Sequence, residues 1–220
     1  MVARELISDA IPPLNLRDTG SKALKWMDEF RVNHLPVVEN KEYLGLVSED
    51  DIFNLNKPEE PMSSHQLAVA RPFVYEEQHI YEAIKLTSKL NLTNLPVLNV
   101  QKEYVGCLTP ADLVRGLASI AAIEGAGGIV VLELNVRDYS LNEISRIVES
   151  NDARILSLYI SSKPESNKLE LTMKIDKMDL TRILASFYRF NYVVKATFHE
   201  SEFIEDVKAR YDSLMNYLNI

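Results

Sequence analysis

Two stretches of the chain decide its fold: NHLPVVENKEYLGLVSEDDI at residues 33–52 and TNLPVLNVQKEYVGCLTPADL at residues 93–113. Their Leu-Pro-Val triplets lie 60 residues apart, and the glycine, hydroxyl and aspartate residues that follow lie 61 apart. Self-similarity at a fixed period indicates an internal repeat. The additional residue of the second copy falls in a predicted turn, near Val100.

Each copy is predicted to contain a strand, a helix, a two-stranded hairpin and a second helix. In the segments 21–30 and 81–90 apolar residues recur three and four apart, which is typical of an amphipathic helix. Polar residues between two apolar, β-rich runs predict the hairpin. One such unit cannot bury both faces of its small sheet. We therefore expect the copies to pack about a pseudo-twofold axis, which leaves two related clefts.

The second half of the chain has a different pattern, which begins after the glycine-rich segment 125–128. Strand and helix patterns follow in the order βαββαβ, and residues 168–175 alternate strictly between apolar and polar. Ser140 and Glu143 have the spacing of a helix capping box. The order predicts a ferredoxin-like sheet with both helices on one face.

These patterns predict an α+β protein in five parts. They are a first repeat at 1–56, a proline-containing linker at 57–64, a second repeat at 65–122, a βαββαβ domain at 127–200 and a C-terminal amphipathic helix at 201–220.

The repeated signature, a hydrophobic-Pro-Val triplet followed by Gly-x-x-Ser/Thr-x-x-Asp, resembles the cystathionine-β-synthase (CBS) domain, which occurs in tandem pairs. Taken alone, Ser48 and Thr109 are predicted N-caps, each with an aspartate three residues later, Asp51 or Asp112. The resemblance implies a second role at the same helix ends. There the hydroxyl residue faces a ligand phosphate and the aspartate binds ribose hydroxyls.

The two copies differ in the charge around this motif. Glu49 and Asp50 offset the positive end of the first helix, whereas the second copy has Pro110 and Ala111. We expect the second copy to hold the phosphate. Arg71 either reaches this phosphate or is a solvated surface charge. The first copy is expected to take a less charged adenosine ligand or none.

The segments before the first strand of each copy resemble the edge that contacts adenine in the family. Ile11 and Pro12 are the candidates there, with a stiff turn as the alternative for the prolines. His34, before Leu35-Pro36, is placed near the first cleft, where it contacts a ligand or serves a structural role.

The βαββαβ segment resembles an ACT domain, a small regulatory unit that often dimerises and binds amino acids. The loop RDYSL lacks the glycine usual in its ligand-binding members, so dimerisation is the expected role. The tail at 201–220 has an apolar stripe that fits either its own domain or a partner. A CBS pair followed by an ACT-like domain resembles the acetoin-utilisation regulator family.

Charge and motifs exclude several functions. The net charge of −8 disfavours nucleic-acid binding, and no apolar run is long enough to span a membrane. The single cysteine, Cys107, allows no intramolecular disulfide and indicates a reducing cytoplasm. With one cysteine and four histidines that lack the spacing of metal ligands, a zinc site is disfavoured. Acidic residues near the N-terminus argue against a signal peptide.

The sequence therefore predicts a non-catalytic homodimeric sensor without a required cofactor. Its expected ligand is AMP, ADP, ATP, S-adenosylmethionine or NAD, and a regulated protein, as yet unknown, is expected to respond to it. The alternative is an oligomerising adaptor with empty clefts, whose ACT-like domain and C-terminal helix bind a protein partner. Catalysis on nucleotides is the third hypothesis.

Overall fold

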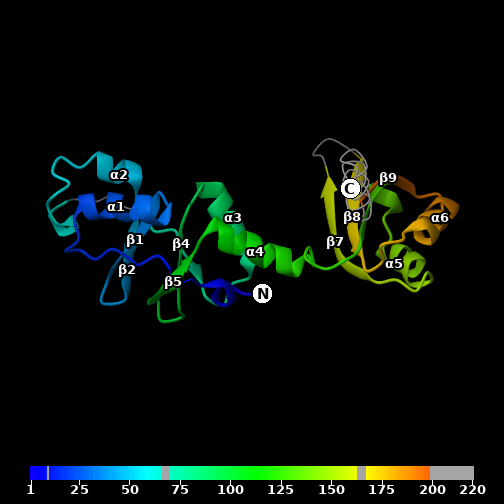
Figure 1. The fold of residues 1–220 in the computed structure, drawn as a ribbon, viewed down its shortest axis with the longest axis horizontal. Helices are drawn as coiled ribbons and strands as arrows, with labels where there is room; N and C mark the ends of the chain where they lie inside the picture. Colours follow the sequence, from blue (N-terminus) through cyan, green and yellow to red (C-terminus); the bar gives the residue numbers. More distant parts are fainter. Residues whose placement is uncertain (9, 66–69, 163–166, 199–220) are drawn as a thin grey trace, which may run out of the picture. The chain divides into compact units, whose positions relative to one another are not determined.

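The computed structural model describes residues 1–8, 10–65, 70–162 and 167–198. The chain divides into two compact units, Met1–Leu117 and Ala118–Ile220 (Figure 1). Within the described ranges, no helix has both the length and the apolar character that a membrane crossing requires.

The first unit contains two similar sets of elements. They are η1 (Ala3–Leu6), α1 (Gly20–Phe30), β1 (His34–Glu39), β2 (Glu42–Ser48), α2 (Glu49–Phe53), η2 (Met62–Ser64), β3 (Val74–Tyr75), α3 (Ile80–Leu90), β4 (Leu95–Leu98), β5 (Tyr104–Leu108) and α4 (Pro110–Ile120), whose last three residues fall in the second unit.

Backbone pairing confirms the repeat. Leu14 bridges Val37 in parallel, and Val74 pairs with Val97 in parallel, so both partners shift by 60 residues between the copies. Each hairpin has a register irregularity directly after its central valine. The additional residue of the second copy lies in its hairpin turn, as the sequence predicted, because four residues separate the pair Val38–Tyr43 and five separate Leu98–Tyr104.

Local sequence explains the ends of the two long helices. The Thr19 side chain caps α1 by accepting a hydrogen bond from the N–H of Lys22, and α1 ends at Arg31 in the left-handed conformation. Helix α3 ends in the same way at Asn91. The buried sides of these helices pack on two apolar clusters, one for each copy.

The two copies exchange contacts through their leading segments. The Ser8 N–H donates to the Cys107 carbonyl at 3.1 Å, so the leading segment of the first copy pairs with the hairpin of the second. The Leu46 N–H donates to the Ala70 carbonyl at 2.9 Å, so the leading segment of the second copy pairs with the hairpin of the first. The hairpins also meet directly, because the Tyr104 N–H donates to the Lys41 carbonyl.

The second unit has the predicted βαββαβ order. Its elements are β6 (Gly128–Asn135), η3 (Val136–Asp138), α5 (Leu141–Glu149), β7 (Ile155–Ser162), β8 (Lys168–Ile175), α6 (Thr181–Arg189) and β9 (Val193–Phe198).

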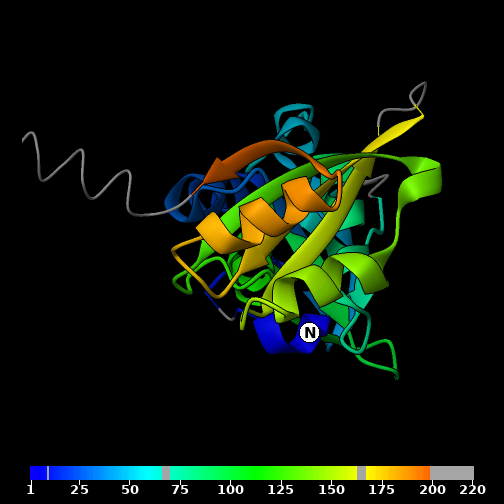
Figure 2. The same ribbon diagram turned by 90° about the vertical axis from the view of Figure 1, so that its right-hand side faces the viewer.

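The four strands form one antiparallel sheet in the order β7-β8-β6-β9, the ferredoxin-like arrangement. Both helices cover one face of this sheet (Figure 2). The alternation in β8 places Leu171 and Met173 in the core beneath the helices and Thr172 on the opposite face. The predicted α+β class is confirmed, while the helix predicted at 201–220 lies outside the described residues.

Candidate functional site

The second copy carries a complete capping box at the start of α4. The Thr109 N–H and Oγ1–H both donate to Asp112 Oδ2, at 2.8 and 2.6 Å, and the Asp112 N–H donates to Thr109 Oγ1 at 3.2 Å. Asp112 is 5% exposed, and its second oxygen accepts a hydrogen bond from Arg115. A buried carboxylate therefore lies at the N-terminus of an eleven-residue helix.

The first copy repeats the hydrogen bonds but not the burial. Ser48 N–H and Oγ–H donate to Asp51 Oδ2 at 2.8 and 2.6 Å, and the Asp51 N–H donates back to Ser48 Oγ at 3.1 Å. Asp51 is exposed, and α2 has only five residues. The residue equivalent to Arg115 is Asn54, which is neutral and donates to the Asp50 carbonyl.

His34 lies beside the first-copy motif and also contacts the second copy. It pairs with Ser48 across the β1–β2 hairpin. Its Nδ1 lies 3.0 Å from Thr93 Oγ1 and accepts from the Thr93 N–H at 3.3 Å. Burial lowers the pKa of His34, and the negative charges of Asp51 and Asp50 partly oppose this. His34, Ser48 and Asp51 thus form one group.

Arg71, which we expected within reach of the second-copy site, has neighbours that contact the hairpin of the first copy. Its neighbour Ala70 is hydrogen-bonded to Leu46 of the first-copy hairpin, and the Tyr43 hydroxyl donates to the Pro72 carbonyl at 3.0 Å. Burial raises the pKa of Tyr43, and the positive charge of Arg71 opposes that rise. The exchange of segments therefore places Arg71 beside the first copy.

Ile11 and Pro12 occupy different environments. Ile11 is 6% exposed and packs in the apolar cluster of the first copy, whereas Pro12 is half-buried. Their segment follows Ser8, which pairs with Cys107 of the second-copy hairpin. Ile11 is consequently a core residue, and Pro12 is the more available of the two for contact with a ligand.

Sequence reasoning missed Asn94 and Arg115. Arg115 lies three residues after Asp112 and could have been found from the (i, i+3) spacing on the predicted helix. Asn94 is the repeat equivalent of His34, 60 residues later, and it is completely buried. The repeat alone would have pointed to Asn94, but its burial could not have been known.

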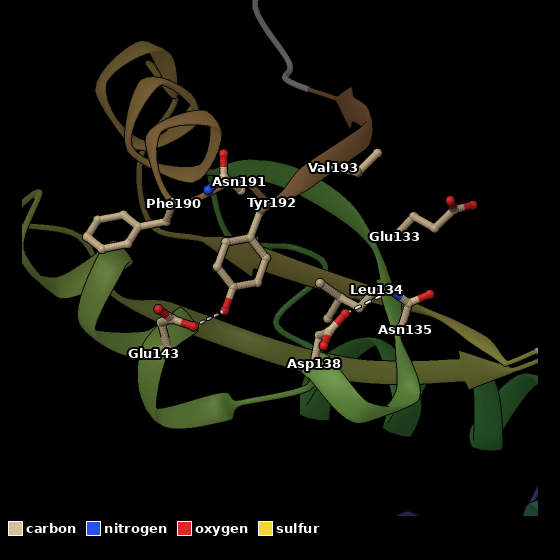
Figure 3. A pocket seen from close by; sticks show the side chains of 9 residues that line it. All are labelled: Glu133, Leu134, Asn135, Asp138, Glu143, Phe190, Asn191, Tyr192 and Val193. Carbon is tan, nitrogen blue, oxygen red and sulfur yellow. Dashed lines mark hydrogen bonds between the residues drawn. The ribbon is translucent and has the colours of Figure 1, made fainter.

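The second unit has its own pocket of about 300 Å³, at the end of β6 and the start of β9 (Figure 3). The Tyr192 hydroxyl donates to Glu143 Oε2 at 2.7 Å across this pocket. Burial raises the pKa of Tyr192, and Glu143 and Asp138 raise it further. The carboxylates of Glu143 and Asp138 form no ion pair with another described residue. The pocket therefore favours a cationic group over an anionic one.

The described part of the chain contains no cluster of three or more His, Cys, Asp or Glu side chains that could hold a metal ion. The chemical resources of the first unit are instead two helix N-termini, each with a hydroxyl and a carboxylate. Such an end supplies unpaired backbone N–H groups and a partial positive charge, and it suits an anionic ligand.

The structure thus contains a duplicated strand–helix–hairpin–helix unit, with exchanged leading segments and a capping box in each copy. Residues 3–57 and 67–119 both match the family model of the CBS domain. The chain therefore carries a tandem pair of CBS domains, as the sequence predicted.

Several solved structures that resemble this chain are proteins with CBS domains. A CBS domain pair/ACT domain protein from Thermotoga maritima is 20% identical, with 54% of this chain and 98% of that chain covered and a TM-score of 0.49. CBSX2 in complex with AMP is 19% identical, with 54% and 97% covered and a TM-score of 0.46. A protein assigned to acetoin utilization (AcuB) from Vibrio cholerae is 21% identical, with 56% and 95% covered and a TM-score of 0.46.

Among curated sequences, an uncharacterized protein from Methanocaldococcus jannaschii is 25% identical over 108 residues. The match includes 47% of this chain and 34% of that protein, so the chain spans about a third of the length of this relative.

Proposed function

We propose that the chain is a regulatory sensor that binds an adenosine nucleotide in the clefts of its CBS pair and signals to a partner protein. The observation that carries this proposal is the capping box of the second copy, where a buried carboxylate and a hydroxyl lie at the start of a long helix. One CBS-pair protein, CBSX2, has been solved with AMP, which makes AMP the first ligand to test.

In the second cleft, Thr109 and the Ala111 N–H in the first turn of α4 face the phosphate. A helix N-terminus stabilises a nearby anion because its N–H groups point outward and its dipole is positive there. Asp112 accepts hydrogen bonds from the ribose hydroxyls. Its oxygens already accept from Thr109 and Arg115, so ligand binding rearranges these contacts. Pro12 lies along the adenine edge, and Ile11 supports it from the core.

The first cleft is proposed as the weaker site. Ser48 and Asp51 have the same roles there, and His34 lies beside them. Three acidic residues crowd the first turn of α2, and Arg71 lies near Tyr43 of the first-copy hairpin. A less charged adenosine derivative suits this cleft better than a polyphosphate does. S-adenosylmethionine and NAD belong in the ligand panel for that reason.

We assign the remaining parts by the same reasoning. The proposed domains are CBS repeats at 1–56 and 65–122, joined by the linker 57–64, then an ACT-like domain at 127–200 and a C-terminal helix at 201–220. The protein acts as a homodimer in the cytoplasm, without catalysis, and ligand binding selects one arrangement of its parts. This selection requires that the ligand binds the two arrangements with different affinity.

The alternative proposal is an adaptor whose clefts stay empty. In that case the capping boxes only stabilise α2 and α4, and the ferredoxin-like unit binds the partner. The acidic pocket of Figure 3 supports a binding role for the second unit by itself.

Thermal melting of the full chain with AMP, ADP, ATP, S-adenosylmethionine and NAD separates the two proposals. A ligand at 100 times its Kd stabilises the folded state by about 2.7 kcal/mol. We expect such a shift in the wild type and its loss in Asp112→Ala. Ser140→Ala is the matched control, because it removes an N-cap from α5, outside the clefts. No shift with any ligand supports the adaptor.

A further inference from the structure

The sheet of the second unit has one face that its described helices leave open. Helices α5 and α6 both lie on the face that carries Leu171 and Met173 (Figure 2). An antiparallel sheet can expose its second face to water, and the side chains there are then expected to be polar. The open face of this sheet instead carries several apolar side chains at its centre, so it is suited to be covered.

Strand pairing brings these apolar residues together, because paired residues of antiparallel strands share a face. Thr172, on the open face of β8, pairs with Val131 of β6 and with Tyr159 of β7. In the next row of the same face, Ile129 pairs with Phe198 of β9. Tyr159 and Phe198 are 59% and 57% exposed, and Val131 and Ile129 are half-buried. The open face therefore has an apolar centre that water reaches.

The charges around this centre have an excess of one positive charge. The open face carries three lysines and two glutamates, which are Lys168, Lys174, Lys195, Glu133 and Glu170. Lys168 forms an ion pair with Glu133, and Lys195 forms one with Glu170. The third lysine, Lys174, donates a hydrogen bond to the Ile123 carbonyl at 2.7 Å. Such a face suits an amphipathic segment with apolar side chains and a net negative charge.

The sequence directly after β9 has both properties. Residues 199–220 follow Phe198 and contain five acidic and two basic side chains, a net charge of −3. At a helical period their apolar residues fall on one stripe, which includes Phe203, Val207, Tyr211, Leu214 and Leu218. A helix of 20 residues is about 30 Å long, and an eight-residue strand such as β8 is about 27 Å long. The segment therefore matches the open face in polarity, charge and length.

We propose that residues 201–220 form an amphipathic helix that docks on the open face of the sheet in the same chain. An isolated helix of this length is marginal in water, and burial of its apolar stripe supplies the missing stability. The short connection from Phe198 keeps the segment near the face at a local concentration in roughly the millimolar range. A second copy of the open face fits less well, because it brings the same positive charge and binds from solution.

Docking within the chain gives the second unit three layers: helices α5 and α6, the sheet, and the proposed helix. This inference goes beyond the nucleotide sensor, because it does not involve the clefts of the CBS pair. A protein partner that uses the open face has to displace residues 201–220 first. The segment is then an internal competitor for this surface.

The deciding experiment is disulfide cross-linking in the full chain with Cys107→Ser as background. The test pair is Thr172→Cys on the open face and Val207→Cys on the apolar stripe. The first control pairs Thr172→Cys with Ala209→Cys, because two residues turn a helix by about 200° and place Ala209 on its polar side. The second control pairs Val207→Cys with Ala185→Cys, which is exposed on α6 on the other side of the sheet. We expect the test pair to form a disulfide within one chain at least roughly tenfold faster than either control.

Two results overturn the proposal. Equal rates for the three pairs show that the segment is not seated on the open face. Disulfides between chains, which give covalent dimers in a non-reducing gel, assign the open face to a contact between copies.

If the cysteine pairs do not fold, methyl NMR of the full chain takes their place. The methyl signals of Ile129 and Val131 should shift in Val207→Glu and stay in place in Ala209→Glu. The methyl signal of Met173, in the core on the other face, should stay in place in both variants. Unchanged signals of Ile129 and Val131 in Val207→Glu contradict the proposal.

Discussion

The backbone N–H of Ser8, in the leading segment of the first CBS copy, donates a hydrogen bond to the carbonyl of Cys107 in the second copy. In the equivalent contact, the backbone N–H of Leu46 in the first copy donates to the carbonyl of Ala70 in the second. Each copy therefore completes its hairpin with a segment from the other, and neither buries its edge alone. We expect the two copies to unfold together, because loss of either removes a strand neighbour from both.

Cys107 provides a probe of this exchange. It is the single cysteine of the chain, it is fully buried, and its Sγ lies 3.7 Å from the Ser8 carbonyl oxygen. We expect a thiol reagent to react roughly 100-fold more slowly with the native protein than with the urea-unfolded protein, because labelling requires local opening. Ala70→Cys in a Cys107→Ser background is the control, since Ala70 is exposed and should label quickly. Fast native labelling of Cys107 would contradict the exchanged arrangement.

The capping boxes should differ in their contribution to stability. Thr109→Ala should lower the free energy of unfolding by about 1 kcal/mol, the usual worth of an N-cap. Ser48→Ala should cost less, because α2 is short and its aspartate is exposed. Thr109→Ser keeps the hydroxyl and should restore stability. Urea titration measures all three, and a larger loss for Ser48→Ala than for Thr109→Ala would argue against the second copy as the better-formed site.

Part of this arrangement could be predicted from the sequence. The 60-residue spacing, the two capping boxes and the βαββαβ order depend on local patterns, and all three appear in the structure. The surroundings of Arg71 could not be predicted, because a segment is naturally assigned to the copy that it leads. The residues on either side of Arg71, Ala70 and Pro72, are hydrogen-bonded to the hairpin of the first copy, and no local pattern encodes that choice.

The burial of individual polar side chains was the second feature that could not be predicted from the sequence. Asp51 and Asp112 have the same spacing and chemistry, yet only Asp112 is buried. Asn94 resembles an ordinary loop residue until the fold encloses it. Both facts depend on how the two copies pack, which depends on residues far apart in the chain.

His34 should make stability depend on pH. Burial lowers its pKa in the folded state below 6.5, so the unfolded chain binds a proton more readily than the folded chain. Above pH 6.5, His34 is uncharged in both states and the stability does not change with pH on its account. As the pH decreases from 6.5 through the lowered pKa, the free energy of unfolding falls. His34→Asn should flatten this part of the curve. Urea unfolding between pH 5 and 7.5 measures the slope, and an unchanged slope in His34→Asn would exclude this role.

The bond between Tyr192 and Glu143 should stabilise the second unit. Tyr192→Phe removes a 2.7 Å hydrogen bond to a carboxylate and keeps the ring contact with Phe187, so we expect a loss of about 1 kcal/mol. Tyr188→Phe is the control, because Tyr188 is 59% exposed. Equal melting temperatures for the two variants would show that the bond contributes nothing.

The nucleotide sensor is tested most directly by calorimetric titration of AMP into the full chain and its Asp112→Ala and Asp51→Ala variants. Both substitutions remove the aspartate of a capping box, but only Asp112 is proposed to hold the stronger site. We predict saturable binding by the wild type and by Asp51→Ala, and at least a roughly tenfold weaker Kd for Asp112→Ala. Equal AMP binding by all three proteins, or no binding by any, would contradict the proposal that the second CBS cleft is the nucleotide site.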